Sequence, residues 1–147
     1  MIKLTDTIWI GDSQDEGYAD IYSEQIGAIL NVAHDMHATR GWMHGSEYAQ
    51  VGLIDGPGNH PSAYHAAILS LAYLLKRHKA VLVCCHGMGR ALSVVLMYLR
   101  LVSGRSMAEW LESLRERVEQ KLPEPHEAHK LAYNRINWRL LLGATEG

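Results

Sequence analysis

Two adjacent cysteines followed closely by an arginine are the residues of this sequence best suited to chemistry. The segment Cys84–Arg90 reads CCHGMGR, follows the apolar run Ala80–Val83, and precedes an apolar stretch with helical spacing. A buried strand, a glycine-rich turn and a helix start form an anion cradle, because the turn N–H groups converge and the helix N-terminus adds positive potential. The same field lowers the pKa of a thiol, so the segment predicts a thiolate nucleophile facing a bound phosphate.

The phosphate contacts are expected from the turn and from the arginine that follows it. Arg90 can donate two parallel hydrogen bonds to phosphate oxygens and keeps its charge. Gly87 and Gly89 are expected to permit the backbone angles and the close approach to the anion that the cradle needs. The predicted phosphate-binding residues, mainly through backbone N–H groups, are Cys85, His86, Gly87, Met88, Gly89 and Arg90.

Strand-like and helix-like segments alternate along the rest of the chain. Strands are predicted for a hairpin within Ile2–Ile10 and for Ala28–Ala33, Tyr48–Ile54 and Ala80–Val83. Helices are predicted for Tyr18–Ile26, for Ser62–Arg77 with Ser62 as its cap, and for Arg90–Val102, Ser106–Gln120 and Glu127–Leu142. His34–Ser46 is expected to be a loop. This order indicates an α/β fold with a mainly parallel sheet, which binds its ligand at the carboxyl ends of the strands.

Length and charge restrict the class of protein. The chain has 147 residues, 48% of them apolar, and 14 basic against 16 acidic side chains give a net charge of −2. We therefore expect a single domain over residues 1–147 and no nucleic-acid-coating function. No apolar run reaches the ~20 residues of a membrane helix, and the N-terminus lacks the pattern of a signal peptide. A soluble, cytoplasmic monomer without a membrane or nucleic-acid partner is expected.

The loop and its surroundings resemble the cysteine-based protein phosphatases, most closely the small dual-specificity type. Cys84, Gly87, Gly89 and Arg90 match the loop pattern Cys-x-x-Gly-x-Gly-Arg of that family. The resemblance continues in the segments Ile8–Asp12, Ile26–Ala33, Leu53–Asp55 and Pro123–Pro125, and so covers nearly the whole chain. It implies a three-layer phosphatase fold, with a mainly parallel twisted central sheet flanked by helices.

The resemblance also implies a catalytic role for each matched residue. Cys84 would attack phosphorus and form a phosphocysteine, and Arg90 with the loop amides would hold the phosphate oxygens. Asp55 would protonate the leaving oxygen and then activate water. The implied substrates are phosphotyrosine, with phosphoserine or phosphothreonine as further candidates, on proteins or small phosphomonoesters. Phosphate, sulfate or vanadate would occupy the loop, and neither a metal nor another cofactor is expected.

Two departures from the family pattern leave alternatives open. Val83 replaces the histidine that precedes the nucleophile, and Ala91 replaces a serine or threonine that stabilises the thiolate, so a higher thiol pKa is expected. Because of these two departures, a phosphate-binding pseudophosphatase remains an alternative interpretation. In a second register Cys85 is the nucleophile, and Cys85-x4-Arg90 has roughly the length of a rhodanese loop. The sequence favours Cys84, since the strand-end position and both glycines fit it and a shorter loop offers fewer amides.

Overall fold

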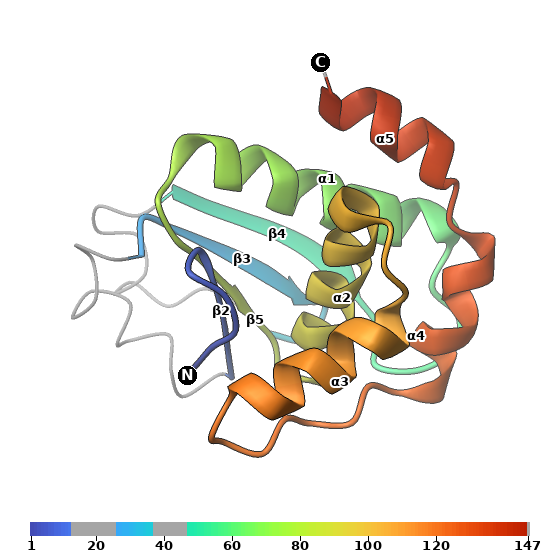
Figure 1. Cartoon of the computed structure of the whole chain (residues 1–147). Coiled ribbons are helices and arrows are strands. Elements are labelled where there is room, and N and C mark those ends of the chain that lie inside the picture. The colour runs from blue at the N-terminus through green and yellow to red at the C-terminus, as the bar shows by residue number, and fades with distance from the viewer. Residues whose placement is uncertain (13–25, 37–46, 147) are drawn as a thin grey trace.

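Five strands form one sheet in the order β1–β2–β5–β3–β4 (Figure 1). The structure, a computed structural model, describes residues 1–12, 26–36 and 47–146. The strands are β1 (Ile2–Lys3), β2 (Ile8–Gly11), β3 (Ala28–Ala33), β4 (Glu47–Leu53) and β5 (Val81–Cys84). β1 and β2 form the predicted antiparallel hairpin, and all other strand pairs are parallel. The mainly parallel α/β sheet expected from the sequence is therefore confirmed.

The central strands are apolar apart from Asn31 of β3, as burial on both faces of a parallel sheet favours. Every residue of β3 and β5 is buried. β5 lies between β2 and β3, so that Cys84 is in register with Gly11 on one side and with Asn31 on the other. The loops after β3, β4 and β5 therefore leave the sheet at the same edge, and the predicted site residues lie on these loops.

Helices pack on the sheet and on one another. They are α1 (Pro61–Arg77), α2 (Gly89–Ser103), α3 (Met107–Arg117), α4 (Glu127–Ala132), a 3₁₀ turn (Tyr133–Arg135) and α5 (Trp138–Glu146). α2 contacts strands β2, β3 and β5 and also packs against α1, α3 and α5, and its residues 90–97 are all buried (Figure 1). Because α2 begins at the predicted phosphate loop, this packing fixes the position of the loop.

Several helix ends differ from the sequence prediction. α1 is capped by His60 instead of Ser62: the His60 ring nitrogen Nδ1 accepts the N–H of Ser62 at 3.1 Å, and Pro61 occupies the first turn. α3 is capped by Ser106, where its predicted range begins: Ser106 Oγ accepts the N–H of Glu109 at 3.1 Å. α3 ends at Arg117 rather than Gln120.

The single C-terminal helix predicted for Glu127–Leu142 is wrong, because the chain is interrupted there. Ile136 takes an extended conformation after the 3₁₀ turn. Asn137 then starts a new helix, as its Oδ1 accepts the N–H of Leu140 at 3.0 Å. The N–H of Asn137 is itself bonded to His65 Nε2 of α1 at 3.0 Å, which holds the break in place. Asparagine is a common helix cap, and this signal was present in the sequence.

Two sequence predictions fall mostly outside the described part of the chain. These are the helix over Tyr18–Ile26, of which only Ile26 is described and is buried, and the loop over His34–Ser46 beyond Met36. No single helix in residues 1–12, 26–36 and 47–146 has the length and apolarity to span a membrane. α2 and α3 reach these criteria only together, as a pair bent by 111°.

Candidate active site

The predicted phosphate loop connects the carboxyl end of β5 to the N-terminus of α2. Gly87 and Met88 both have positive φ angles, 72° and 64°, and Met88 immediately precedes the first residue of α2. Left-handed residues at a strand-to-helix turn direct successive N–H groups toward one point, as an anion-binding turn requires. Non-glycine residues seldom adopt this conformation, so its occurrence at Met88 marks a constrained loop.

The two glycines of the loop differ in what they contribute. Gly87 needs its conformational freedom, as predicted, because of its positive φ. Gly89 does not: it begins α2 without a positive φ, and a Cβ atom there would first meet the carbonyl oxygen of Glu124 at 3.9 Å. Of the two roles expected of the glycines, the special backbone angle therefore belongs to Gly87 alone, since Met88 and not Gly89 adopts the left-handed conformation.

The adjacent cysteines are both buried at the start of the loop. Cys84 is the last residue of β5, and the N–H of Cys85 still bonds to the carbonyl of Gly11 at 3.3 Å. The Sγ of Cys85 accepts the backbone N–H of Ala91 in the first turn of α2 at 3.2 Å. The thiol of Cys85 is thus directed at the N-terminus of α2.

The thiol of Cys85 has a pKa above its usual value. Burial raises the pKa most, and the hydrogen bond from Ala91 and the positive charge of Arg90 offset this only in part. The negative charge of Asp55 also raises it, so the carboxylate and this thiol lie close enough to interact. The charged groups around Cys85 are those that the sequence predicts for the site.

Arg90 lies almost fully buried behind the loop, with 2% of its surface exposed. Its Nη1 donates to Asp35 Oδ1 at 2.9 Å and to the carbonyl of Leu53 at 2.9 Å, which fixes the guanidinium between the ends of β3 and β4. Its Nε is buried and has no hydrogen-bond partner among the described residues. A buried donor without a partner is costly, and an oxyanion in the loop is the ligand that would accept from it.

Asp35 orients this arginine, a role that spacing alone could not indicate. Partial burial, the largest single cause, raises the pKa of the Asp35 carboxyl, but the hydrogen bond and charge of Arg90, a backbone hydrogen bond and the charge of His34 together bring the pKa below its usual value. The exposed His86 of the loop contacts the carbonyl of Asp35 at 3.3 Å. The turn after β3 is itself held by Asn31, whose Oδ1 accepts the N–H of Ala33 at 3.0 Å and whose Nδ2 donates to the carbonyl of Met36 at 2.6 Å.

Asp55 follows β4 and presents a half-exposed carboxylate on the side of the loop. One of its oxygens, Oδ1, lies 3.3 Å from Nε2 of His129, a fully buried residue of α4. His129 is 74 residues away in the chain, and no sequence pattern pointed to it. The structure thus brings together Asp55, Arg90 and the cysteine loop, and adds Asp35 and His129 to them.

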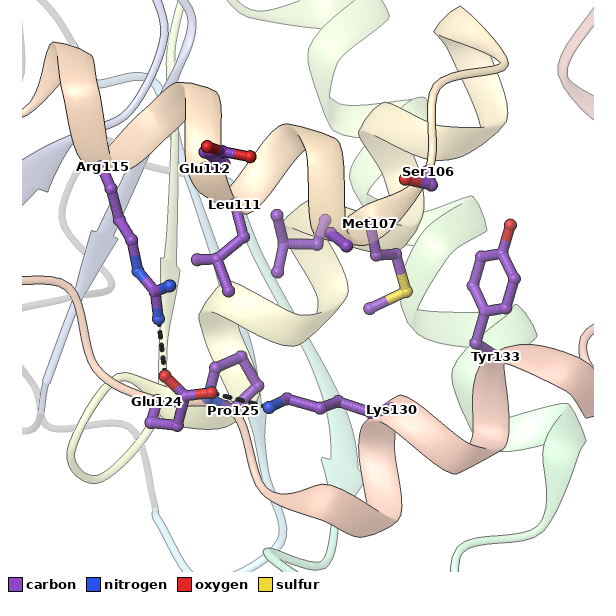
Figure 2. Close-up of a pocket in the computed structure, with 11 residues that line it drawn as sticks. Ser106, Met107, Leu111, Glu112, Arg115, Glu124, Pro125, Lys130 and Tyr133 are labelled. Carbon is purple, nitrogen blue, oxygen red and sulfur yellow. Dashed lines mark hydrogen bonds and ion pairs between the residues drawn. The ribbon is translucent and has the colours of Figure 1, made fainter.

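A cavity of about 620 Å³ lies apart from these residues, between α3 and the segment that carries α4 (Figure 2). Figure 2 shows Arg115 and Lys130 both directed at Glu124, whose carboxylate they contact at 2.6 Å each. The apolar part of the lining is Leu96, Met107, Ala108, Leu111 and Pro125. None of the predicted catalytic residues lines this cavity.

The fold is that of the small dual-specificity and tyrosine phosphatases. Human DUSP28 superimposes with a TM-score of 0.79 at 15% identity, over 98% of this chain and 99% of that chain. A mouse putative dual specificity phosphatase complexed with zinc tungstate gives a TM-score of 0.79 at 16% identity, over 98% of this chain and 90% of that one. Tk-PTP in the active form gives a TM-score of 0.73 at 16% identity, over 93% of this chain and 95% of that one.

The sequence itself is distant from characterised proteins. No family model matches the chain, and no curated protein matches it. At identities of 14–16% the similarity to solved structures is a similarity of fold. The phosphatase architecture that the sequence resemblance implied is therefore confirmed, and the chemistry has to be argued from the residues of this chain.

Proposed function

We propose that this protein hydrolyses phosphomonoesters, phosphotyrosine foremost, through a phosphocysteine intermediate. The observation that carries the proposal is the meeting of a thiol, the N-terminus of α2 and the buried, partly unpartnered guanidinium of Arg90. These are the groups needed to attack a phosphate and to neutralise its charge. The mouse relative of the same fold was crystallised with tungstate, a tetrahedral oxyanion, which agrees with phosphate binding.

We assign the attack to Cys85, whereas the sequence favours Cys84 because of its strand-end position, the two glycines and the longer loop. The Sγ of Cys85 is in contact with the helix N-terminus, where a thiolate is stabilised. Consecutive residues of an extended segment point in opposite directions, so the two thiols are not expected to face the same point. With Cys85 as the nucleophile, the amides from His86 to Arg90 remain for the phosphate oxygens, and the loop is one residue shorter than the family pattern.

The reaction then takes two steps at one phosphorus atom. In the first, the cysteine thiolate forms a bond to phosphorus, the bond from phosphorus to the ester oxygen breaks, and Asp55 gives its proton to that oxygen. In the second, Asp55 takes a proton from water, the water oxygen attacks phosphorus, and the thiolate leaves. Arg90 and the loop amides hold the non-bridging oxygens in both steps.

The phosphatase rate is expected to rise with pH from neutrality. Because the pKa of the Cys85 thiol is raised, mostly by burial, the neutral thiol predominates at pH 7 and the reactive thiolate increases as the pH is raised. Measuring kcat/KM for para-nitrophenyl phosphate between pH 5 and 9 checks this, because para-nitrophenolate leaves readily without a proton and the rate then follows the amount of thiolate. A rate already constant from pH 5 to 7 would contradict a protonated thiol in the resting protein.

A sulfurtransferase is the second candidate, and the position of Cys85 favours it specifically. Cys85-x4-Arg90 has roughly the loop length of the rhodaneses, which carry sulfur on a loop cysteine. The fold favours the phosphatase. Thiosulfate:cyanide transfer that exceeds phosphate release would decide for the sulfurtransferase.

The deciding experiment compares catalysis with binding. We expect metal-free turnover of para-nitrophenyl phosphate in the presence of a chelator, and inhibition by vanadate. Vanadate at a hundred times its Kd should stabilise the fold by about 2.7 kcal/mol, which is visible as a higher Tm. Stabilisation by vanadate without any turnover would instead identify a phosphate-binding pseudophosphatase. Absence of both effects would reject an oxyanion site altogether.

A further inference from the structure

A buried chain of hydrogen bonds ends at the carboxylate of Asp55. His129 of α4 contacts Asp55 Oδ1 through Nε2 at 3.3 Å and the hydroxyl of Tyr64 on α1 through Nδ1 at 2.7 Å. The Tyr64 hydroxyl oxygen also accepts a hydrogen bond from Nδ2 of Asn59 at 3.3 Å. His129 is 0% exposed and Asp55 is 53% exposed, so the chain runs from the interior to the open side of the site.

The direction of each hydrogen bond in this chain follows from Asn59. Its Oδ1 accepts the N–H of Ile54 at 2.9 Å and its Nδ2 donates to the carbonyl of Ile54 at 2.8 Å, which fixes the orientation of the amide. Nδ2 is therefore a donor to the oxygen of Tyr64. The buried hydroxyl needs an acceptor for its own proton, and Nδ1 of His129 is the acceptor in contact.

The proton of a neutral His129 then resides on Nε2, facing Asp55. Burial, the largest cause, lowers the pKa of His129, whereas the hydrogen bond and charge of Asp55 raise it. The other charged or titratable groups that act on this ring, Arg90 and His126, also lower the pKa; the ring of His126 lies 5.8 Å from that of His129. The net direction favours the neutral imidazole that the hydrogen bonds require.

We propose that His129 is a positioning residue for Asp55, in the Nε2–H tautomer set by Tyr64 and Asn59. This inference rests on the proposed function. His129 donates to Oδ1 and keeps its proton throughout, so that Oδ2 is the oxygen that exchanges a proton with the leaving group and then with water. A fixed donor at Oδ1 therefore orients the carboxyl group in the same way in both steps.

Rescue by a conservative variant and the split between kcat and KM separate this role from a structural one. His129→Phe keeps a ring at this buried position, and combining it with Tyr64→Phe avoids leaving a buried hydroxyl without an acceptor. In the double variant we expect kcat for phosphotyrosine to fall by about tenfold with KM unchanged, because the carboxylate has lost the donor that orients it. His129→Gln, which retains an N–H donor, should restore much of the wild-type kcat.

Tyr98→Phe on α2 is the matched control, since Tyr98 is a partly buried tyrosine on another helix, and it should leave kcat unchanged. A folded His129→Gln variant as slow as the double variant, or a folded double variant with the wild-type kcat, would overturn the positioning role. A control that lowers kcat as far as the double variant would do the same.

Nuclear magnetic resonance of the His129 ring tests the tautomer without using activity. We expect a neutral ring protonated at Nε2 at pH 7. An active enzyme whose His129 is protonated at Nδ1, or is charged at pH 7, would overturn this inference and leave the proposed function intact. An inactive protein with the expected tautomer would overturn the proposed function and with it any catalytic role of His129.

Discussion

Cys85→Ser is expected to abolish phosphatase turnover, whereas Cys84→Ser retains it. Loss of a nucleophile that forms a covalent intermediate lowers kcat by a factor of at least about 10³. Cys84 belongs to β5 and contributes to the buried sheet, so its replacement should reduce the rate by less than about tenfold when the protein is folded. Turnover of para-nitrophenyl phosphate by the two variants at equal concentration measures the difference.

The two cysteine variants control for one another. Both thiols are buried, so each serine introduces a hydroxyl into the interior and similar destabilisation is expected. Rapid acid quenching followed by peptide mass spectrometry should place the phosphoryl group on Cys85. An inactive, folded Cys84→Ser beside an active Cys85→Ser would return the nucleophile to the residue that the loop length predicts.

The choice between the two thiols shows what the sequence could provide at this site. The spacing Cys84-x5-Arg90 matches a family pattern, and β5 ends at Cys84, the strand-end position expected for that residue. A spacing does not state which thiol accepts a hydrogen bond from the first turn of α2, because that contact depends on the folded loop; in the structure Cys85 accepts the N–H of Ala91.

The fold was the more predictable part. Two elements lie within about one residue of their predicted bounds: the largely apolar strand Ala28–Ala33 and the helix before Gly104. Burial determines the first locally and the left-handed glycine determines the end of the second. The partners of the site residues were not predictable. Asp35 meets Arg90 across 55 residues and His129 meets Asp55 across 74 residues, and such contacts depend on how the elements pack.

Arg90→Lys is expected to lower kcat/KM by a factor of about 10² to 10³, the second large effect on activity. In the wild type, Nη1 of Arg90 donates to Asp35 and to the carbonyl of Leu53, while Nε is a second, separate donor. Lysine keeps the positive charge, but its single nitrogen cannot occupy both positions. The loss should therefore appear in turnover and in the affinity for vanadate together. A protein that only binds phosphate would show only the loss of affinity for vanadate, because it has no transition state to stabilise.

Asp35→Asn distinguishes the charge of Arg90 from its orientation. The amide oxygen can still accept from Nη1, so the guanidinium should stay in place, and we expect less than a tenfold decrease in kcat/KM. Asp35→Ala removes the acceptor, and the guanidinium then loses one of the two contacts that hold Nη1. If orientation matters, alanine lowers kcat/KM by at least a further factor of about ten, as the misplacement of a catalytic group would. Equal rates in the asparagine and alanine variants would mean that the carbonyl of Leu53 alone holds the arginine.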